Sequence, residues 1–162
     1  MNALRRCGTG AAHVLVLLMI TSLVVTGPAL AVQIWPVPGP VIAEFDPPDP
    51  DWLPGHRGID LAVGLGDPIR SPRDGVIQFA GSVGGTPIVV VSHGVVAATY
   101  LPATTALSVG DSVAAAMVFA EVGDADHCVA TCLHWGARAN GRYVDPRILL
   151  GEYEVVLTPL TD

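Results

Sequence analysis

Short apolar runs separated by Gly, Pro and Asp are the feature that most constrains the fold of this chain. From residue 56 onward they recur at close to the 8–12-residue spacing that is typical of β-sandwiches and β-barrels. A short strand is expected earlier, in VIAEF, and a last one in GEYEVVLTPL. The runs between them are GIDLAV, PIRS, GVIQFAG, TPIVVVSH, VVAATY, AMVFAEV and TCLHWGAR. The pattern predicts a single all-β domain.

Helical signals are weak by comparison, since no long amphipathic stretch and no internal repeat occurs. One short helical turn is expected at DPRILLG, residues 145–151, where Asp145 can cap and Pro146 takes the first helical position.

The first 31 residues differ from the rest of the chain. Arg5 and Arg6 precede the apolar run VLVLLMITSLVV, and Ala29-Leu30-Ala31 supplies the small side chains that a signal peptidase needs. Because the apolar run is short for a membrane span, we predict a signal peptide cleaved near Ala31 and a secreted or cell-wall location. An uncleaved N-terminal anchor is the alternative; after cleavage no stable membrane span is expected.

Charge and composition limit the classes of binding partner that we expect. The chain has no lysine, and removal of Arg5 and Arg6 takes its formal net charge from −7 to about −9. Such an acidic surface argues against nucleic acids and anionic membranes as partners. Residues 32–55 form a proline-rich lead-in, in which Trp35, Phe45 and Trp52 have apolar area that we expect to pack on the domain.

A candidate metal site begins in GHRGIDLA. His56 and Asp60 are four residues apart, so a strand would place them on one face and Ile59 on the other. His134, in CLHWGAR, is the candidate third ligand, and two imidazoles with a carboxylate suit a zinc ion that keeps one position open for water. By spacing alone, a surface His–Asp ion pair explains the motif equally well.

Several ordered motifs together carry a family resemblance. They are GHRGIDLAVGLGDPIRSPRDGVIQFAG, VVVSHG, TYLPA, SVGDSVAAAMVFAEVG, CLHWGAR and NGRYVDP. From about Phe45 to Leu150 the chain resembles the lysostaphin-type (LytM-like) zinc endopeptidases, family 23 of the metallopeptidases, and within them a secreted actinobacterial subgroup with CLHWG in place of the H-x-H motif. The resemblance implies an antiparallel β-sandwich or split barrel of the LytM type, with His56, Asp60 and His134 as zinc ligands.

Two positions depart from the family pattern. Pro102 stands where Y-x-H-L has its histidine, and Cys132 stands where H-x-H has its first. The family uses those two histidines to activate water and stabilise the intermediate, so the catalytic residues of this chain stay unassigned. Cys132 as a thiolate, His127, Asp124 and Asp126 are conceivable replacement bases.

Cys132 has three interpretations. It can pair with Cys128 in a disulfide, fill the fourth zinc position as a thiolate, or remain a free thiol beside the metal. We favour the Cys128–Cys132 disulfide, because a secreted chain with an even count of cysteines usually oxidises them. Elsewhere, Tyr100 and Trp135 are expected to pack in the core, and His93 at a turn or rim.

These observations predict four segments: a signal peptide at 1–31, the lead-in at 32–55, a LytM-like peptidase domain at 56–151 and a C-terminal strand or tail at 152–162. The favoured function is a secreted zinc metalloendopeptidase, weakened by its departures, that hydrolyses peptide crosslinks of bacterial peptidoglycan. The first alternative is a catalytically degenerate domain that binds peptidoglycan or activates another wall hydrolase. The second is a secreted β-domain with only a His–Asp pair.

Overall fold

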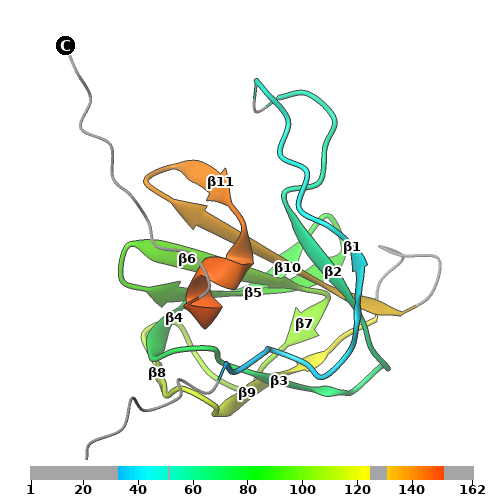
Figure 1. Ribbon diagram of the computed structural model, residues 1–162. Coiled ribbons are helices and arrows are strands. Elements are labelled where there is room, and N and C mark those ends of the chain that lie inside the picture. The colour runs from blue at the N-terminus through cyan, green and yellow to red at the C-terminus, as the bar shows by residue number, and fades with distance from the viewer. Residues whose placement is uncertain (1–32, 51, 125–130, 152–162) are drawn as a thin grey trace, which may run out of the picture. The chain divides into compact units, whose positions relative to one another are not determined.

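The computed structural model describes residues 33–50, 52–124 and 131–151 (Figure 1). Nearly every element in these ranges is a strand, and the one helical segment is a short 3₁₀ helix. The elements are β1 (Val41–Ala43), β2 (Gly58–Ala62), β3 (Pro68–Arg70), β4 (Gly75–Val83), β5 (Thr86–His93), β6 (Val96–Leu101), β7 (Ala103–Thr104), β8 (Ser112–Val113), β9 (Val118–Val122), β10 (Cys132–Ala139), β11 (Arg142–Val144) and η1 (Pro146–Leu150). This confirms the predicted all-β class.

Two antiparallel sheets build the described domain. The larger runs β1-β2-β10-β6-β5-β4-β8, with β11 paired to β10, and the smaller runs β3-β9-β7. The strand β10 lies between β2 and β6, so a strand near the end of the chain is held on both sides by much earlier segments (Figure 1). This placement brings CLHWGAR beside GHRGIDLA.

The core follows from alternating side chains along these strands. In β6, Val96, Ala98 and Tyr100 are buried while the residues between them are only partly so, which is the period of two expected of a strand with one face on a core. The β10 residue Trp135 is fully buried, and its ring stacks on Tyr100 with centroids 6.5 Å apart. The core roles predicted for Tyr100 and Trp135 are confirmed.

The proline-rich lead-in joins the larger sheet. Its strand β1 pairs with β2, and Val37 is buried. The rings of Trp35 and Trp135 pack edge to face, with their centroids 6.2 Å apart. Gly39 lies against the backbone of Ala62 at the end of β2. A Cβ at residue 39 would be 1.7 Å from the Ala62 carbonyl oxygen, so only glycine fits. Trp35 and Phe45 both pack against the core, as expected.

The expectation for Trp52 is wrong, because its side chain is 82% exposed. The chain leaves the domain at Asp46 and returns at His56, where backbone hydrogen bonds of 2.9 and 2.8 Å join those two residues. The described residues between them, 47–50 and 52–55, belong to a projecting loop (Figure 1). Apolar area on Trp52 would favour burial, but the loop carries it away from the core.

The helical turn predicted at 145–151 is present as η1. Asp145 caps it by accepting a hydrogen bond from the Arg147 backbone amide at 2.9 Å, Pro146 begins it, and Gly151 ends it at φ +82°.

Other predictions fall outside the described residues: the signal peptide at 1–31, most of the strand in GEYEVVLTPL, and the tail at 152–162. Within the part of the chain that the structure describes, no helix is long and apolar enough to cross a membrane.

Candidate metal centre

Pairing of β2 with β10 brings two of the three predicted ligands together, and His56 joins them from just before β2. In the β2–β10 ladder, His134 is the direct partner of Asp60. The Nδ1 atom of His134 lies 2.8 Å from Oδ1 of Asp60, and Nε2 of His56 lies 3.1 Å from that same oxygen and 3.1 Å from His134 Nδ1. Among the described residues these three side chains form a cluster whose ligand atoms lie within 4.8 Å of one another.

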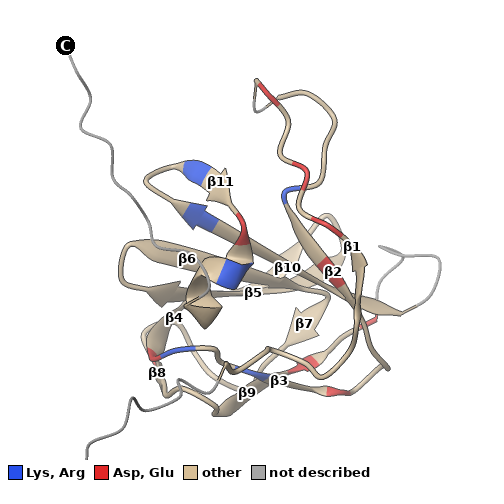
Figure 2. Cartoon of the chain, viewed as in Figure 1, with Lys and Arg blue, Asp and Glu red and all other residues tan. Residues whose placement is uncertain are grey.

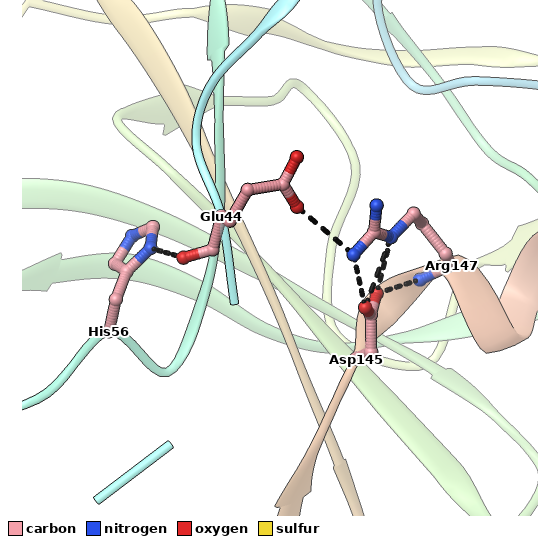
Figure 3. A network of polar contacts seen from close by, with 4 residues as sticks. All are labelled: Glu44, His56, Asp145 and Arg147. Carbon is pink, nitrogen blue, oxygen red and sulfur yellow. Dashed lines mark hydrogen bonds and ion pairs between the residues drawn. The ribbon is translucent and has the colours of Figure 1, made fainter. Parts of the chain in front are cut away.

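His56 reaches the cluster in a way that the sequence did not indicate. It precedes β2 instead of lying on it, at the isolated bridge to Asp46. Its Nδ1 donates a hydrogen bond to the Glu44 carbonyl oxygen at 2.6 Å, since that oxygen can only accept (Figure 3). This bond fixes the ring so that Nε2 points to Asp60 and His134.

The opposite face of the same strands is core. Ile59 and Leu61 in β2 are fully buried on either side of Asp60, and Leu133 and Trp135 are fully buried on either side of His134. The predicted alternation is therefore confirmed for both strands, and it anchors the backbone beneath two of the three ligands.

Two facing glycines make room for the His134 ring. Gly58 and Gly136 are direct partners across the β2–β10 ladder. A Cβ on Gly58 would lie 2.7 Å from His134 Nε2 and 2.5 Å from the Trp135 carbonyl oxygen, and one on Gly136 would lie 3.4 Å from His134 Nε2. The ring therefore rests over the glycine pair, which leaves Nδ1 to face Asp60.

The electrostatics favour a charged Asp60. Burial raises the pKa of its carboxyl, but the hydrogen bond from His134 and the charges of His134 and His56 outweigh this and hold the pKa below its ordinary value. Asp60 is therefore ionised at neutral pH and offers an anionic oxygen beside two ring nitrogens.

This donor set fits zinc. Ligand atoms about 2.0–2.2 Å from a tetrahedral zinc lie roughly 3.3–3.6 Å from one another, and the three separations here are somewhat shorter, at 2.8, 3.1 and 3.1 Å. Two histidines and one carboxylate leave the fourth position open, as catalytic zinc sites do. The donor types and their close spacing thus form a candidate metal site, and the same separations join the three side chains by hydrogen bonds.

A model of peptidase family M23 matches residues 54–146, more than half of the chain. The chain belongs to peptidase family M23. Its M23 domain carries the antiparallel fold of that family, which confirms the family resemblance and the fold class.

Three similar proteins illustrate the match. An uncharacterised protein of Mycobacterium tuberculosis is 36% identical over 172 residues, which cover 97% of this chain and 69% of that protein. The DD-carboxypeptidase/endopeptidase Mpg of Neisseria meningitidis serogroup B is 36% identical over 93 residues, or 56% of this chain and 22% of that protein. The crystal structure of a zinc-containing peptidase from Vibrio cholerae is 24% identical with a TM-score of 0.62, covering 72% of this chain and 39% of that one.

The two departures from the M23 pattern lie next to the cluster. Leu101 is the β6 partner of His134, and Pro102 follows it as a buried residue. Cys132 is buried on β10 two residues before His134, yet it is not part of the ligand cluster, so its thiolate gains no support as a fourth ligand. Cys128 lies outside the described residues, and the disulfide stays a prediction.

The candidate replacement bases gain little support from the structure. Asp124 is exposed and lies outside the cluster, while Asp126 and His127 are not among the described residues. Burial raises the pKa of Tyr100, so its hydroxyl stays protonated. His93 lies at the end of β5, where its Nδ1 donates to the Asp74 carbonyl oxygen at 3.0 Å, consistent with the predicted rim packing.

Proposed function

We propose that this M23 domain is a zinc-dependent endopeptidase that hydrolyses peptide bonds in bacterial peptidoglycan. The observation that carries the proposal is the cluster of His56, Asp60 and His134, whose donor atoms and spacing suit one zinc ion. Membership of a peptidase family supports the reaction type, and similarity to the meningococcal carboxypeptidase/endopeptidase and the Vibrio zinc-containing peptidase supports the chemistry.

In this mechanism His56, Asp60 and His134 hold the metal, which, when bound, lowers the pKa of water and polarises the peptide carbonyl. The anionic Asp60 favours capture of a cation, and the bond from His56 Nδ1 to Glu44 keeps Nε2 free to face the ion. Hydrolysis adds the oxygen of water to the carbonyl carbon, breaks the C–N bond and transfers a proton to the leaving amine.

The chain lacks two groups that usually assist that proton transfer. Pro102 has no side chain that can accept a proton, and neither Pro102 nor Cys132 offers an imidazole. Loss of a general acid or base typically slows a reaction by about 10²–10⁴-fold. We therefore propose a slow enzyme.

The same two substitutions favour a second candidate function, a domain that binds peptidoglycan or activates a separate wall hydrolase without cutting peptides itself. The two proposals separate in one assay. Purified protein is incubated with insoluble peptidoglycan, with zinc and with a chelator, and both peptide release and co-sedimentation are measured.

Zinc-dependent release of new amino groups, absent in His134→Ala, is the result expected of the enzyme. Sedimentation with the wall but no release in any condition would contradict it and support the binding domain.

We further propose that residues 1–31 are a signal peptide cleaved near Ala31, that the protein acts at the cell wall, and that Cys128 and Cys132 form a disulfide. The sequence supports each of these. The N-terminal sequence of the protein recovered from culture medium tests the cleavage: a start at Val32 is expected, and a start at Met1 would contradict it. A thiol count on the denatured, unreduced mature protein tests the disulfide, with none expected.

A further inference from the structure

We propose that Arg147 is a positioning residue for the metal centre, acting through Glu44 on the ligand His56. This inference rests on the proposed zinc-dependent function. It concerns residues on either side of the segment that the family model matches, which ends at 146 and begins at 54. The metal centre of this chain would then depend on the proline-rich lead-in and on the segment after the V-D-P motif.

The first step is the orientation of the Arg147 guanidinium. Its Nε donates to both carboxylate oxygens of Asp145 at 3.0 Å, and its Nη2 donates to Oδ2 at 2.6 Å. The Asp145 carboxylate also caps η1 through the Arg147 amide. A guanidinium held this way presents a fixed donor fork, because the planar group cannot turn without losing two bonds at once (Figure 3).

The second step carries this rigidity to the lead-in. Nη2 of Arg147 lies 3.1 Å from the Glu44 carboxylate, and Figure 3 shows the Glu44 side chain extending toward the guanidinium while its carbonyl turns the other way, to His56. One residue thus receives the arginine on its side chain and holds the zinc ligand on its main chain. The side chain of Arg147 is 22% exposed, so part of this link is shielded from water.

The third step concerns what else holds His56. Its backbone pairs with Asp46 through bonds of 2.9 and 2.8 Å, and its ring is held by the Glu44 carbonyl at 2.6 Å. Both of these supports come from the short segment that follows β1, whereas the Nε2 side of the ring contacts Asp60 of β2 and His134 of β10 at 3.1 Å. A shift of this segment would move His56 relative to Asp60 and His134, whose positions are fixed by the sheet. Fixing Glu44 therefore preserves the geometry of all three ligands.

The test measures zinc affinity by competition with a chromogenic chelator, together with the thermal midpoint of the zinc-free protein. The variants are Arg147→Gln, Glu44→Gln and the double variant, and the control is Arg142→Gln. Arg142 is an exposed arginine of β11, so the control makes the same charge change on a neighbouring element.

We expect Arg147→Gln to weaken zinc binding about tenfold, at the lower end of the effect of outer-shell changes. Glu44→Gln should weaken it only about threefold, because the amide oxygen of glutamine can still accept a hydrogen bond from the Arg147 guanidinium although the charge is lost. The double variant should be no weaker than Arg147→Gln alone, and Arg142→Gln should match the wild type. Loss of folding stability alone would lower the zinc-free midpoint without changing affinity in this pattern.

If the wild type binds zinc, and Arg147→Gln binds it with the same affinity as Arg142→Gln, this inference is overturned and the proposed function still stands. The inference would also be overturned if the double variant lost as much zinc-binding free energy as the two single variants together, since Arg147 would then not act through Glu44. A wild-type protein that binds no zinc would overturn both proposals. If Arg147→Gln does not fold, Glu44→Gln decides alone, because its exposed side chain is not needed for the core.

Discussion

At the scale of single residues, the candidate centre depends on which ring atom of each histidine faces it. His56 presents Nε2 because the Glu44 carbonyl holds Nδ1, whereas His134 presents Nδ1 because its Nε2 side rests over Gly58 and Gly136. The two imidazoles therefore reach Asp60 from different directions with different nitrogens. Gly58 is thus a specific requirement of the site, since a Cβ at this position would lie 2.7 Å from Nε2 of the His134 ring.

We predict that Gly58→Ala displaces His134. The new Cβ would meet His134 Nε2 at 2.7 Å and a backbone oxygen at 2.5 Å, and such overpacking typically costs about 1–3 kcal/mol. Zinc affinity should fall along with the free energy of unfolding. Gly64→Ala is the control, because its Cβ would meet nothing closer than 3.4 Å; equal zinc binding by the two variants would contradict the steric account.

We predict a pH dependence of stability that belongs to His93. Burial lowers the pKa of His93 below its ordinary 6.5, the nearby Arg73 charge lowers it further, and the Asp74 carbonyl and carboxylate offset only part of this. Between the two pKa values, His93 is therefore protonated in the unfolded chain and neutral in the folded one. The stability from neutral His93 is full above about pH 6.5 and is lost as pH falls toward the folded-state pKa.

Urea unfolding of the zinc-free protein between pH 7.5 and pH 5 measures this effect. His93→Asn keeps a donor for Asp74 but does not titrate, so its stability should fall less than that of the wild type over this range. Parallel curves for the two proteins would show that His93 is not the group responsible.

At the scale of elements, the lead-in is a structural part of the M23 domain. Its strand β1 extends the larger sheet beside β2, and the residues after it carry the bonds to His56 (Figure 1). An ion pair makes the same connection, because the Glu44 carboxylate in the lead-in lies 3.1 Å from the Arg147 guanidinium in η1. Figure 2 shows acidic positions in red on the chain after β1 and a basic position in blue on the short helix η1. The proline-rich lead-in, which the sequence predicted to pack on the domain, therefore also contributes to the surroundings of the candidate ligand His56.

We predict that Val37→Ala destabilises the domain by about 2 kcal/mol, because Val37 is 2% exposed and loses two methyl groups from a filled core. Val95→Ala makes the same chemical change at a side chain that is 77% exposed, and should alter stability by less than about 0.5 kcal/mol. Equal effects in chemical denaturation would indicate that the lead-in does not pack as described.

At the scale of the whole molecule, the sequence predicted what depends on local pattern. Alternation along β2, β6 and β10 and the cap at Asp145 were readable from nearby residues, and the candidate ligands His56, Asp60 and His134 lie close together as expected. Two features could not be predicted from the sequence: Gly58 lies opposite Gly136 in the β2–β10 ladder, and Glu44 contacts Arg147. Each depends on how segments far apart in the chain are aligned. The expected packing of Trp52 was wrong, because the apolar area of a side chain does not predict whether its loop lies against the core or projects from it.

The central claim is that His56, Asp60 and His134 bind one zinc ion. Metal analysis of the purified mature protein, after dialysis against zinc-free buffer, tests this most directly when wild type and His134→Ala are measured side by side. The account predicts about one zinc per wild-type chain and almost none in the variant, because removal of one of three ligands leaves too few donors for a stable site. Equal zinc in both proteins, or none in the wild type, would contradict it.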